Sequence, residues 1–347
     1  RQMCIRDSPC TQRNRAGAES HYSHLCRGGY GDYQTVDNGC PKKRRGRKMI
    51  ESIFAIIAST IRFSIPYTLA GLGGVYSERS GVVNIGLEGQ MLAGAFTAVA
   101  VANVSGNAWL GLLAAIFVGM MFGLVHAVVS ITYKADQIVS GLAIIIFAAG
   151  ITVFFSWLMF NKTQIKAEYT LRLPYLHDIP FFQVLFSEIQ IKIFLTVDIV
   201  IDSHFIIFKS VFGLRLRSVG EHPKAADKLG INVYRMRYMA VIISGGLAGL
   251  GGAYLSLEHA HYFVKGISAG RGFIGLASMI FGKWTPLGTA GAGLLFGFGE
   301  ALKPYLPKIV TSQFIDMIPY ILTIFVLTTT IGRATPPATI GIPYSKE

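Results

Sequence analysis

Cysteine is missing from most of this chain. Residues 49–347 contain none, because every cysteine precedes Met49. That absence excludes a cysteine nucleophile from residues 49–347, and no Ser/His/Asp grouping is recognisable there either. We therefore expect no catalytic residue and no enzyme activity of the chain's own. The four cysteines are Cys4, Cys10, Cys26 and Cys40.

Charged residues are also scarce, at 15% of the 347 residues, whereas 52% are hydrophobic and 39 are glycine. This composition excludes a soluble domain of this length. From Met49 onward, several apolar stretches approach or exceed the ~20 residues that cross a bilayer as a helix. The sequence therefore predicts an all-α, polytopic transmembrane helix bundle of about 8–10 spans.

Two of the expected spans differ from the others. The stretch 82–103 contains Asn84, Glu88 and Gln90 among its apolar residues, and the stretch 271–284 is short for a full crossing. Both can be broken or re-entrant, since irregular backbone is tolerated at membrane depth when protein or a cavity surrounds it. The expected spans lie at about 50–75, 82–103, 108–132, 138–160, 190–209, 239–258, 271–284, 286–303 and 313–332.

Residues 1–48 differ in character, with eleven Lys/Arg against four Asp/Glu. A zinc module is disfavoured because the cysteine spacing includes no Cys-x-x-Cys. The basic run 42–48 can be an anionic-lipid or nucleic-acid patch, but the apolar bulk of the chain argues against a nucleic-acid partner. No signal-peptide pattern is present. We interpret 1–48 as a disordered or non-native extension, with the natural start at Met49 and the membrane domain at 49–347.

The charge of the loops predicts the orientation. The loop 209–238 carries seven Lys/Arg against two Asp/Glu and is expected on the cytoplasmic side, with 161–190 outside. Counting the expected spans back from this cytoplasmic loop places the Met49 end outside, which conflicts with a basic run 42–48 held inside. Either that run is not native, or the Asn84–Glu88 region adds a half-span and changes the parity.

A short capped helix is expected within this cytoplasmic loop. Pro223 fits the first turn of a helix, and Gly230 fits the left-handed residue just past its end. Ala225, Ala226 and Leu229 then fall on one face. A helix of two turns needs a partner surface to hold it, although a merely solvated positive loop is the alternative.

Three stretches resemble known proteins. Gly213–Tyr238 resembles the cytoplasmic coupling segment of permeases of ATP-binding-cassette (ABC) importers. Ser77–Leu92 and Gly270–Gly288 resemble the branched-chain amino acid/ribose-type permease superfamily. Within it they are most similar to the second permease of nucleoside importers of the basic membrane protein, or simple sugar, type.

This resemblance implies a multi-pass permease subunit in the bacterial plasma (inner) membrane that moves nucleosides or related ribose-containing solutes by alternating access. It implies four kinds of partner: a second homologous permease, two cytoplasmic ATPase subunits or domains, an external substrate-binding protein and membrane lipid. The residues expected to couple the chain to the ATPases are Ala225, Ala226, Asp227, Leu229 and Gly230.

No ATP site is recognisable in the chain itself. The nearest imitation of a phosphate-binding loop is Gly282-Lys283. It lacks the first glycine, where Ala277 stands, and the Ser/Thr that binds magnesium, where Trp284 stands. We therefore expect this chain to bind no cofactor and no metal, with ATP and Mg²⁺ used by the partner subunits.

Polar groups within apolar stretches are the candidates for the substrate path. Asn84 and Glu88 have i, i+4 spacing, which predicts one helical face that can hydrogen-bond ribose hydroxyls. Alternatively, Glu88 pairs with Arg79 or caps a neighbouring helix. Gln137 and Phe273 are weaker candidates, Phe273 because an aromatic ring can stack on a base.

Other functions stay open on the sequence alone. Asp198, Asp202 and His204 lie inside an expected span, where they can face the interior, sit near the interface or form a relay. An ion-driven secondary transporter or channel can use Asp198 and Asp202 together with Glu88. An importer of the same superfamily for sugars or branched-chain amino acids is the other alternative.

Overall fold

The computed structural model describes residues 41–169, 171, 188–305, 317, 321 and 336–345. The chain separates into two units, Arg1–Arg47 and Lys48–Glu347. The four cysteines and the expected span at 313–332 lie outside the described residues. Whether residues 1–48 are native, and how many spans the whole chain has, stay predictions.

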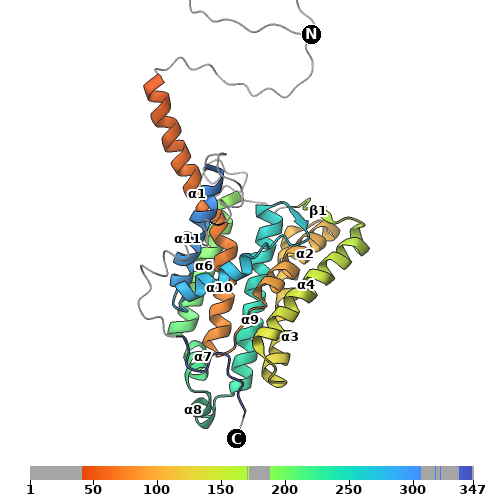
Figure 1. The fold of residues 1–347 in the computed structure, drawn as a ribbon, viewed down its shortest axis with the longest axis vertical. Coiled ribbons are helices and arrows are strands. Elements are labelled where there is room, and N and C mark those ends of the chain that lie inside the picture. The colour runs from red at the N-terminus through yellow and green to blue at the C-terminus, as the bar shows by residue number, and fades with distance from the viewer. Residues whose placement is uncertain are drawn as a thin grey trace, which may run out of the picture. The chain divides into compact units, whose positions relative to one another are not determined.

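The second unit is a bundle of helices with one small sheet (Figure 1). The helices of the first half are α1 (Pro41–Arg79), α2 (Leu87–Ser105), α3 (Ala108–Ala127), η1 (Val128–Thr132) and α4 (Gln137–Phe160). Those of the second half are α6 (Glu188–Lys209), α7 (Val211–Glu221), α8 (Pro223–Lys228), α9 (Val233–Ala253), η2 (Tyr254–His259), α10 (Arg271–Phe281), α11 (Pro286–Leu302) and η3 (Lys303–Tyr305). Strands β1 (Gln164–Lys166) and β2 (Tyr262–Val264) pair antiparallel, with Ile165 opposite Phe263.

Length, apolar content and local caps explain why these residues form helices. The Asn107 side chain accepts a hydrogen bond from the N–H of Trp109 (2.9 Å) and so begins α3. Asp136 begins α4 by accepting from the N–H groups of Ile138 and Val139, both at 2.9 Å. Five described helical segments are long and apolar enough to cross a membrane, which confirms the predicted all-α polytopic bundle.

The centre of the bundle is formed by α2, α3 and α9, which pack through glycine. A Cβ on Gly119 of α3 would overlap the carbonyl oxygen of Gly245 of α9, and a Cβ on Gly245 would overlap that of Gly119. A Cβ on Gly94 of α2 would lie 2.5 Å from the Gly249 carbonyl oxygen. These small residues let the helix backbones touch, as in other membrane bundles.

The two segments that we expected to be broken or re-entrant differ in outcome. The helix α2 begins only at Leu87, after the non-helical residues 80–86, but it then continues unbroken to Ser105 and is long enough to cross the membrane. The helix α10 has eleven residues, about 17 Å of helix, which is too short to cross a bilayer. It follows the non-helical residues 265–270.

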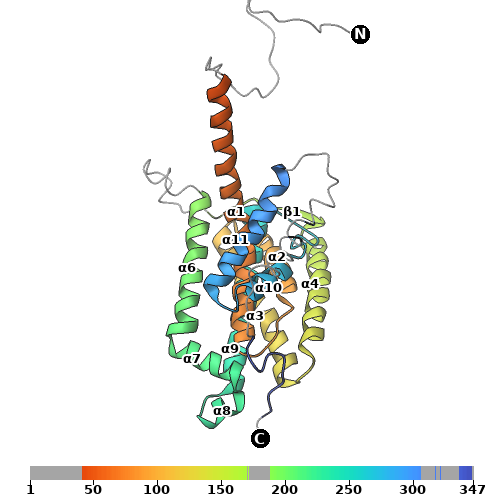
Figure 2. The ribbon, with the colours of Figure 1, turned by 60° about the vertical axis from the view of Figure 1, so that its left-hand side comes forward.

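The helices α7 and α8 lie at one end of this unit, and the sheet lies at the opposite end (Figures 1 and 2). Helix α1 ends at the α8 end, where a Cβ on Gly220 would overlap the carbonyl oxygen of Arg79. Helix α2 returns to the sheet end, where the amide of Asn103 donates to the carbonyl of Lys166 (2.8 Å). Residues 84–88 therefore add no half-span.

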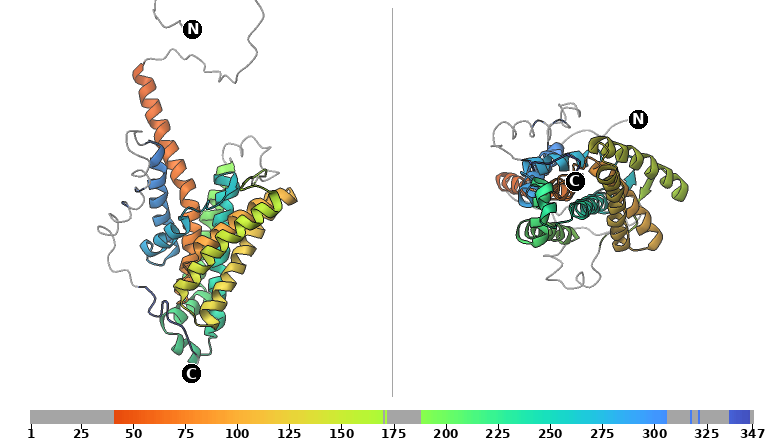
Figure 3. Two further views of the ribbon diagram at one scale, coloured as in Figure 1. Left: turned by 45° about the vertical axis from the view of Figure 1, so that its right-hand side comes forward. Right: turned by 90° about the horizontal axis from the view of Figure 1, so that it is seen from below.

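The loops 161–169 and 209–238 accordingly lie at opposite ends, as their charges predicted. The α8 end also carries the described C-terminal residues 336–345 (Figure 3). We call it the cytoplasmic end, because it contains the seven Lys/Arg of the 209–238 loop.

Candidate functional site

The non-helical residues before α2 are held by side chains from two other helices, α3 and α4. The N–H of Val83 donates to Oε1 of Gln137 (2.7 Å), and its carbonyl oxygen lies 2.9 Å from Nε2 of His126. A carbonyl only accepts, so Nε2 of His126 is the donor. In the neutral ring, Nδ1 then accepts from the hydroxyl of Ser140 (2.9 Å). Both polar groups of the half-buried Val83 backbone are thereby satisfied.

Asn84 lies in this non-helical segment and is fully buried. Its Nδ2 donates to Oε1 of Gln90 (3.1 Å) and to the hydroxyl of Ser244 on α9 (3.0 Å). The predicted common helical face of Asn84 and Glu88 is wrong, because the helix begins only at Leu87. The cause is the turn at residues 80–86, which the i, i+4 spacing does not reveal.

Glu88 caps a neighbouring helix, one of the two alternatives given by the sequence. Its Oε1 accepts from the N–H of Gly270 (2.9 Å), and its Oε2 accepts from the N–H of Gly272 (2.6 Å). No side chain of Gly270 can cap α10, so Glu88 satisfies N–H groups that the helix leaves unpaired. The approach is close, since a Cβ on Gly272 would lie 2.5 Å from Cα of Glu88. The negative charge also favours this helix end.

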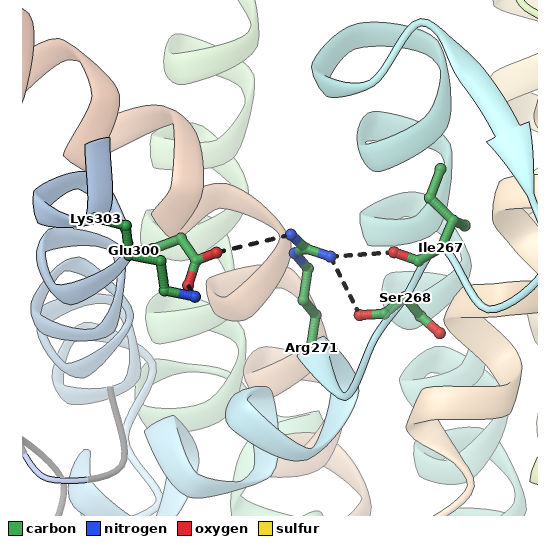
Figure 4. Close-up of polar contacts among 5 residues, drawn as sticks. All are labelled: Ile267, Ser268, Arg271, Glu300 and Lys303. Atoms are coloured by element: carbon green, nitrogen blue, oxygen red, sulfur yellow. Dashed lines mark hydrogen bonds and ion pairs between the residues drawn. The ribbon is translucent and has the colours of Figure 1, made fainter. Parts of the chain in front are cut away.

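Arg271 holds the other side of the same break (Figure 4). Its Nη1 donates to the carbonyl oxygens of Ile267 (3.1 Å) and Ser268 (3.5 Å), and its Nη2 lies 4.0 Å from Oε1 of Glu300 on α11. Lys303 pairs with the other oxygen of Glu300 at 2.9 Å. The residues before α10 are therefore fixed both to α2 and to α11.

These contacts define the candidate substrate path as the place where two non-helical segments, 80–86 and 265–270, approach the first turn of α2. Irregular backbone inside a membrane protein supplies polar groups that a continuous helix keeps paired. Sequence reasoning named Asn84, Glu88 and Gln137 here but missed His126 and Ser244. The missed signal was a polar side chain within an apolar stretch.

Phe273 is half-exposed, at 43%, one residue past Gly272. It is the third residue of α10, in the first turn that Glu88 caps, but no described contact joins it to Asn84 or Gln137. A hollow lies between α1, α6 and α11, with a volume of about 320 Å³. Its lining is apolar apart from the hydroxyls of Ser64, Thr68 and Thr196. The substrate-path roles of Asn84, Glu88, Gln137 and Phe273 stay predictions.

The expected short helix is present at the cytoplasmic end as α8. Pro223 is its first residue, and Gly230 follows it with φ +83°. Its predicted single face is wrong: Ala226 is 2% exposed and packs inward, whereas Ala225 is exposed and Leu229 is 82% exposed. Ala225 and Ala226 point about 100° apart because they are neighbours on the helix, and Leu229 lies past the last helical residue, Lys228. Asp227 is half-buried.

The carboxylates of α6 do not face the interior of this chain. Asp198 and Asp202 are exposed one helical turn apart, whereas His204 is half-buried with its ring 5.1 Å from that of Phe208. Within the part of the chain that the structure describes, no three His, Cys, Asp or Glu residues come together as metal ligands.

We expect Gln137→Leu to leave the N–H of Val83 unpaired in a half-buried position, which costs up to about 3 kcal/mol of stability. The side chain is of similar size, so packing alone changes little. The thermal unfolding temperature in detergent measures the loss. The same change at the exposed Gln164 of β1 is the control, and equal stability of the two variants would contradict the assigned contact.

A family model described as "Branched-chain amino acid transport system / permease component" matches residues 56–327. The chain belongs to this permease family. The Bacillus subtilis guanosine ABC transporter permease protein NupQ is 45% identical over 86% of this permease and 98% of its own length. The Lactococcus lactis nucleoside ABC transporter permease protein NupC is 38% identical over 86% of this chain and 99% of its own. The permease is also 30% identical to NupP, a second guanosine permease protein of B. subtilis, over 78% of this chain and 80% of that protein.

Membership explains the architecture. The permease is a multi-pass membrane protein, as the apolar helices require. The helix α8 falls within the matched residues, on the cytoplasmic end, in the stretch that resembles a coupling segment. The non-helical segments 80–86 and 265–270 also fall within the matched residues.

Proposed function

We propose that this chain is a permease subunit of an ABC importer for nucleosides, and that it passes them across the plasma membrane by alternating access. The observation that carries the substrate class is the 45% identity with a guanosine permease over 98% of that protein's length. The buried amides and carboxylate around residues 80–90 support it. When the bundle opens, the Asn84, Gln90 and Ser244 groups can exchange their mutual hydrogen bonds for bonds to ribose hydroxyls.

ATP hydrolysis in this proposal belongs to two partner ATPases, which also hold Mg²⁺, so the chain itself binds no cofactor. The surroundings of Trp284 support this division. Its indole N–H donates to Oε2 of Glu78 (2.6 Å), and its carbonyl oxygen accepts from Nε of Arg79 (2.9 Å). These contacts make residues 282–284 a structural junction between α10 and α1 rather than a loop that is free to wrap a phosphate.

The proposed complex also includes an external binding protein and a second homologous permease. Two guanosine permease proteins of B. subtilis both resemble this chain, as do two nucleoside permease proteins of L. lactis. The exposed carboxylates Asp198 and Asp202 on α6 support a second permease, because a carboxylate facing lipid costs about 2.5–3.5 kcal/mol. A protein partner or a water-filled path at that face removes this cost.

The test is reconstitution with the neighbouring gene products. We expect the full chain to co-purify with an ATPase, and guanosine with the binding protein to raise both ATP hydrolysis and uptake in liposomes. Uptake that needs an ion gradient but no ATP would instead establish a secondary transporter. Stimulation by a sugar or by leucine, but not by guanosine, would move the substrate class within the family.

Leu229→Glu is expected to abolish co-purification of the ATPase without unfolding the permease. The side chain is 82% exposed at the end of α8, so a charge there disturbs a docked partner and not the bundle. Val104→Glu is the control, because Val104 is 70% exposed at the opposite, sheet end. ATPase binding that survives Leu229→Glu, or that is lost equally with Val104→Glu, would contradict docking through α8. Ala226→Arg is a poorer test, because Ala226 is 2% exposed and an arginine there would disturb the packing of α8 as well as any docking.

A further inference from the structure

Residues 336–345, here named the C-terminal strap, join two distant parts of the cytoplasmic end. The N–H and the hydroxyl of Thr339 both donate to the carbonyl of Gly220, at 3.1 and 2.6 Å. The N–H of Gly341 donates to the carbonyl of Gly81 (3.1 Å). The strap therefore ties the end of α7 to the turn between α1 and α2.

A third anchor comes from α9. Arg237 is only 2% exposed, and its Nη1 donates to the carbonyl of Ile342 (3.1 Å). Tyr234 donates to the carbonyl of Tyr344 (3.4 Å), and the two rings pack edge to face at 5.6 Å. A buried guanidinium needs acceptors, and Nε and Nη2 of Arg237 have none among the described residues. The strap thus supplies the described acceptor of a buried charge.

The strap's contacts lie next to α8 on one side and next to the Val83–Asn84 segment on the other. Gly220 and Glu221, whose carboxylate accepts from the N–H of Ala338 (3.2 Å), directly precede α8. Gly81 lies two residues before Val83, and a Cβ on Gly341 would be 3.8 Å from the Val83 side chain. A continuous set of contacts therefore runs from α8 through the strap to the Val83–Asn84 segment.

A cavity separates the strap from α8 itself. Its volume is about 510 Å³, and the strap's hydrogen bonds near α8 go to Gly220 and Glu221 at the end of α7. Tyr344 of the strap and Ala226 of α8 belong to the same buried hydrophobic cluster. This arrangement leaves α8 room to shift while residues 220–221, which precede it, stay bonded to the strap. The lining residues are His222, Pro223, Lys224, Ala225, Lys228, Thr339, Ile342, Pro343, Tyr344 and Ser345.

We propose that the C-terminal strap is a positioning element that transmits movement of α8 to the Val83–Asn84 segment of the substrate path. This proposal rests on the proposed function, because α8 moves only if a partner ATPase drives it. The strap's anchors are mostly main-chain groups on both sides, which suits the transfer of displacement. Thr339 is the key side chain, since its hydroxyl makes the shorter of its two bonds to Gly220.

Thr339→Val and Tyr344→Ala test the strap in the full chain, reconstituted with its ATPases, second permease and binding protein. We expect both variants to co-purify with the ATPase and to retain ATP hydrolysis without guanosine. The stimulation of hydrolysis by guanosine, and guanosine uptake, should both fall about fivefold or more, the typical size of a lost coupling. Thr339→Ser keeps the hydroxyl and should restore stimulation.

Ile342→Ser is the matched control, because that side chain is 55% exposed and its main-chain carbonyl remains available to Arg237. Unchanged stimulation in Thr339→Val and Tyr344→Ala would overturn the proposal. Equal loss of stability, ATPase binding and stimulation would also overturn it, by making the strap purely structural. If the wild-type chain neither binds an ATPase nor transports guanosine, the proposed function fails first and leaves the strap nothing to transmit.

Discussion

Replacing Glu88 with alanine is expected to abolish guanosine uptake and to lower the thermal stability of the permease more than any other single polar substitution named above. The change removes two charge-assisted hydrogen bonds, to the N–H groups of Gly270 and Gly272. Each is worth about 1.5–3 kcal/mol, so the loss is about 3–6 kcal/mol. The start of α10 also loses the negative charge that favours a helix N-terminus.

Two further variants separate the cap from a general effect of charge. Glu88→Gln keeps one acceptor oxygen, so one of the two N–H groups stays paired and we expect about half of the loss. Glu168→Ala removes a carboxylate from an exposed position and should leave the unfolding temperature unchanged. A Glu88→Ala protein as stable as Glu168→Ala would show that α10 does not depend on this cap. The unfolding temperature in detergent and uptake in liposomes measure these outcomes.

Gly119→Leu is expected to prevent accumulation of folded permease. A Cβ at this position would overlap the carbonyl oxygen of Gly245, and it would lie 3.0 Å from Cα of Gly249. The substitution therefore pushes α3 away from α9 along the contact that holds the centre of the bundle. Overpacking of a tight interior costs about 1–3 kcal/mol even for small additions, and a leucine adds several methyl(ene) groups. Gly119→Ala adds only one methyl group, so we expect a loss of stability near the lower end of this range, about 1 kcal/mol.

The matched control is Gly150→Leu on α4, where nothing lies within 4 Å of an added Cβ. Leucine forms helices better than glycine by up to about 1 kcal/mol, so this variant should be as stable as the wild type or slightly more. Yield of monodisperse protein after detergent extraction measures both. If Gly119→Leu and Gly150→Leu give equal yields, close α3–α9 contact does not hold the bundle together.

Local signals in the sequence predicted the helices well. The stretch expected at 108–132 coincides with the combined α3 and η1 segment, Ala108–Thr132. Apolar length decides such a segment, because the bilayer requires a helix of about 20 residues. The short helix at Pro223–Lys228 was also predicted, since proline and glycine act on the backbone at their own positions.

The sequence predicted which residues share a helical face less well than it predicted where helices occur. The i, i+4 spacing of Asn84 and Glu88 suggested one face, but Asn84 precedes the helix. Similarly, Ala226 and Leu229 separate into a buried and an exposed residue because α8 stops one residue before Leu229. In both cases a helix end falls between the two residues, and periodicity is meaningful only inside a helix.

What the sequence by itself determined is that this chain is a helical membrane protein with one helix, α10, too short to cross the membrane and a short cytoplasmic helix, α8. Each of these features depends on composition or on residues a few positions apart. Only the tertiary structure decided the partners of Glu88, which are 182 and 184 residues away, and the anchoring of the strap to Gly81 and Gly220. Such contacts depend on how the glycine faces of α2, α3 and α9 bring the helices together. No local sequence pattern predicts which residues so far apart in the chain will meet.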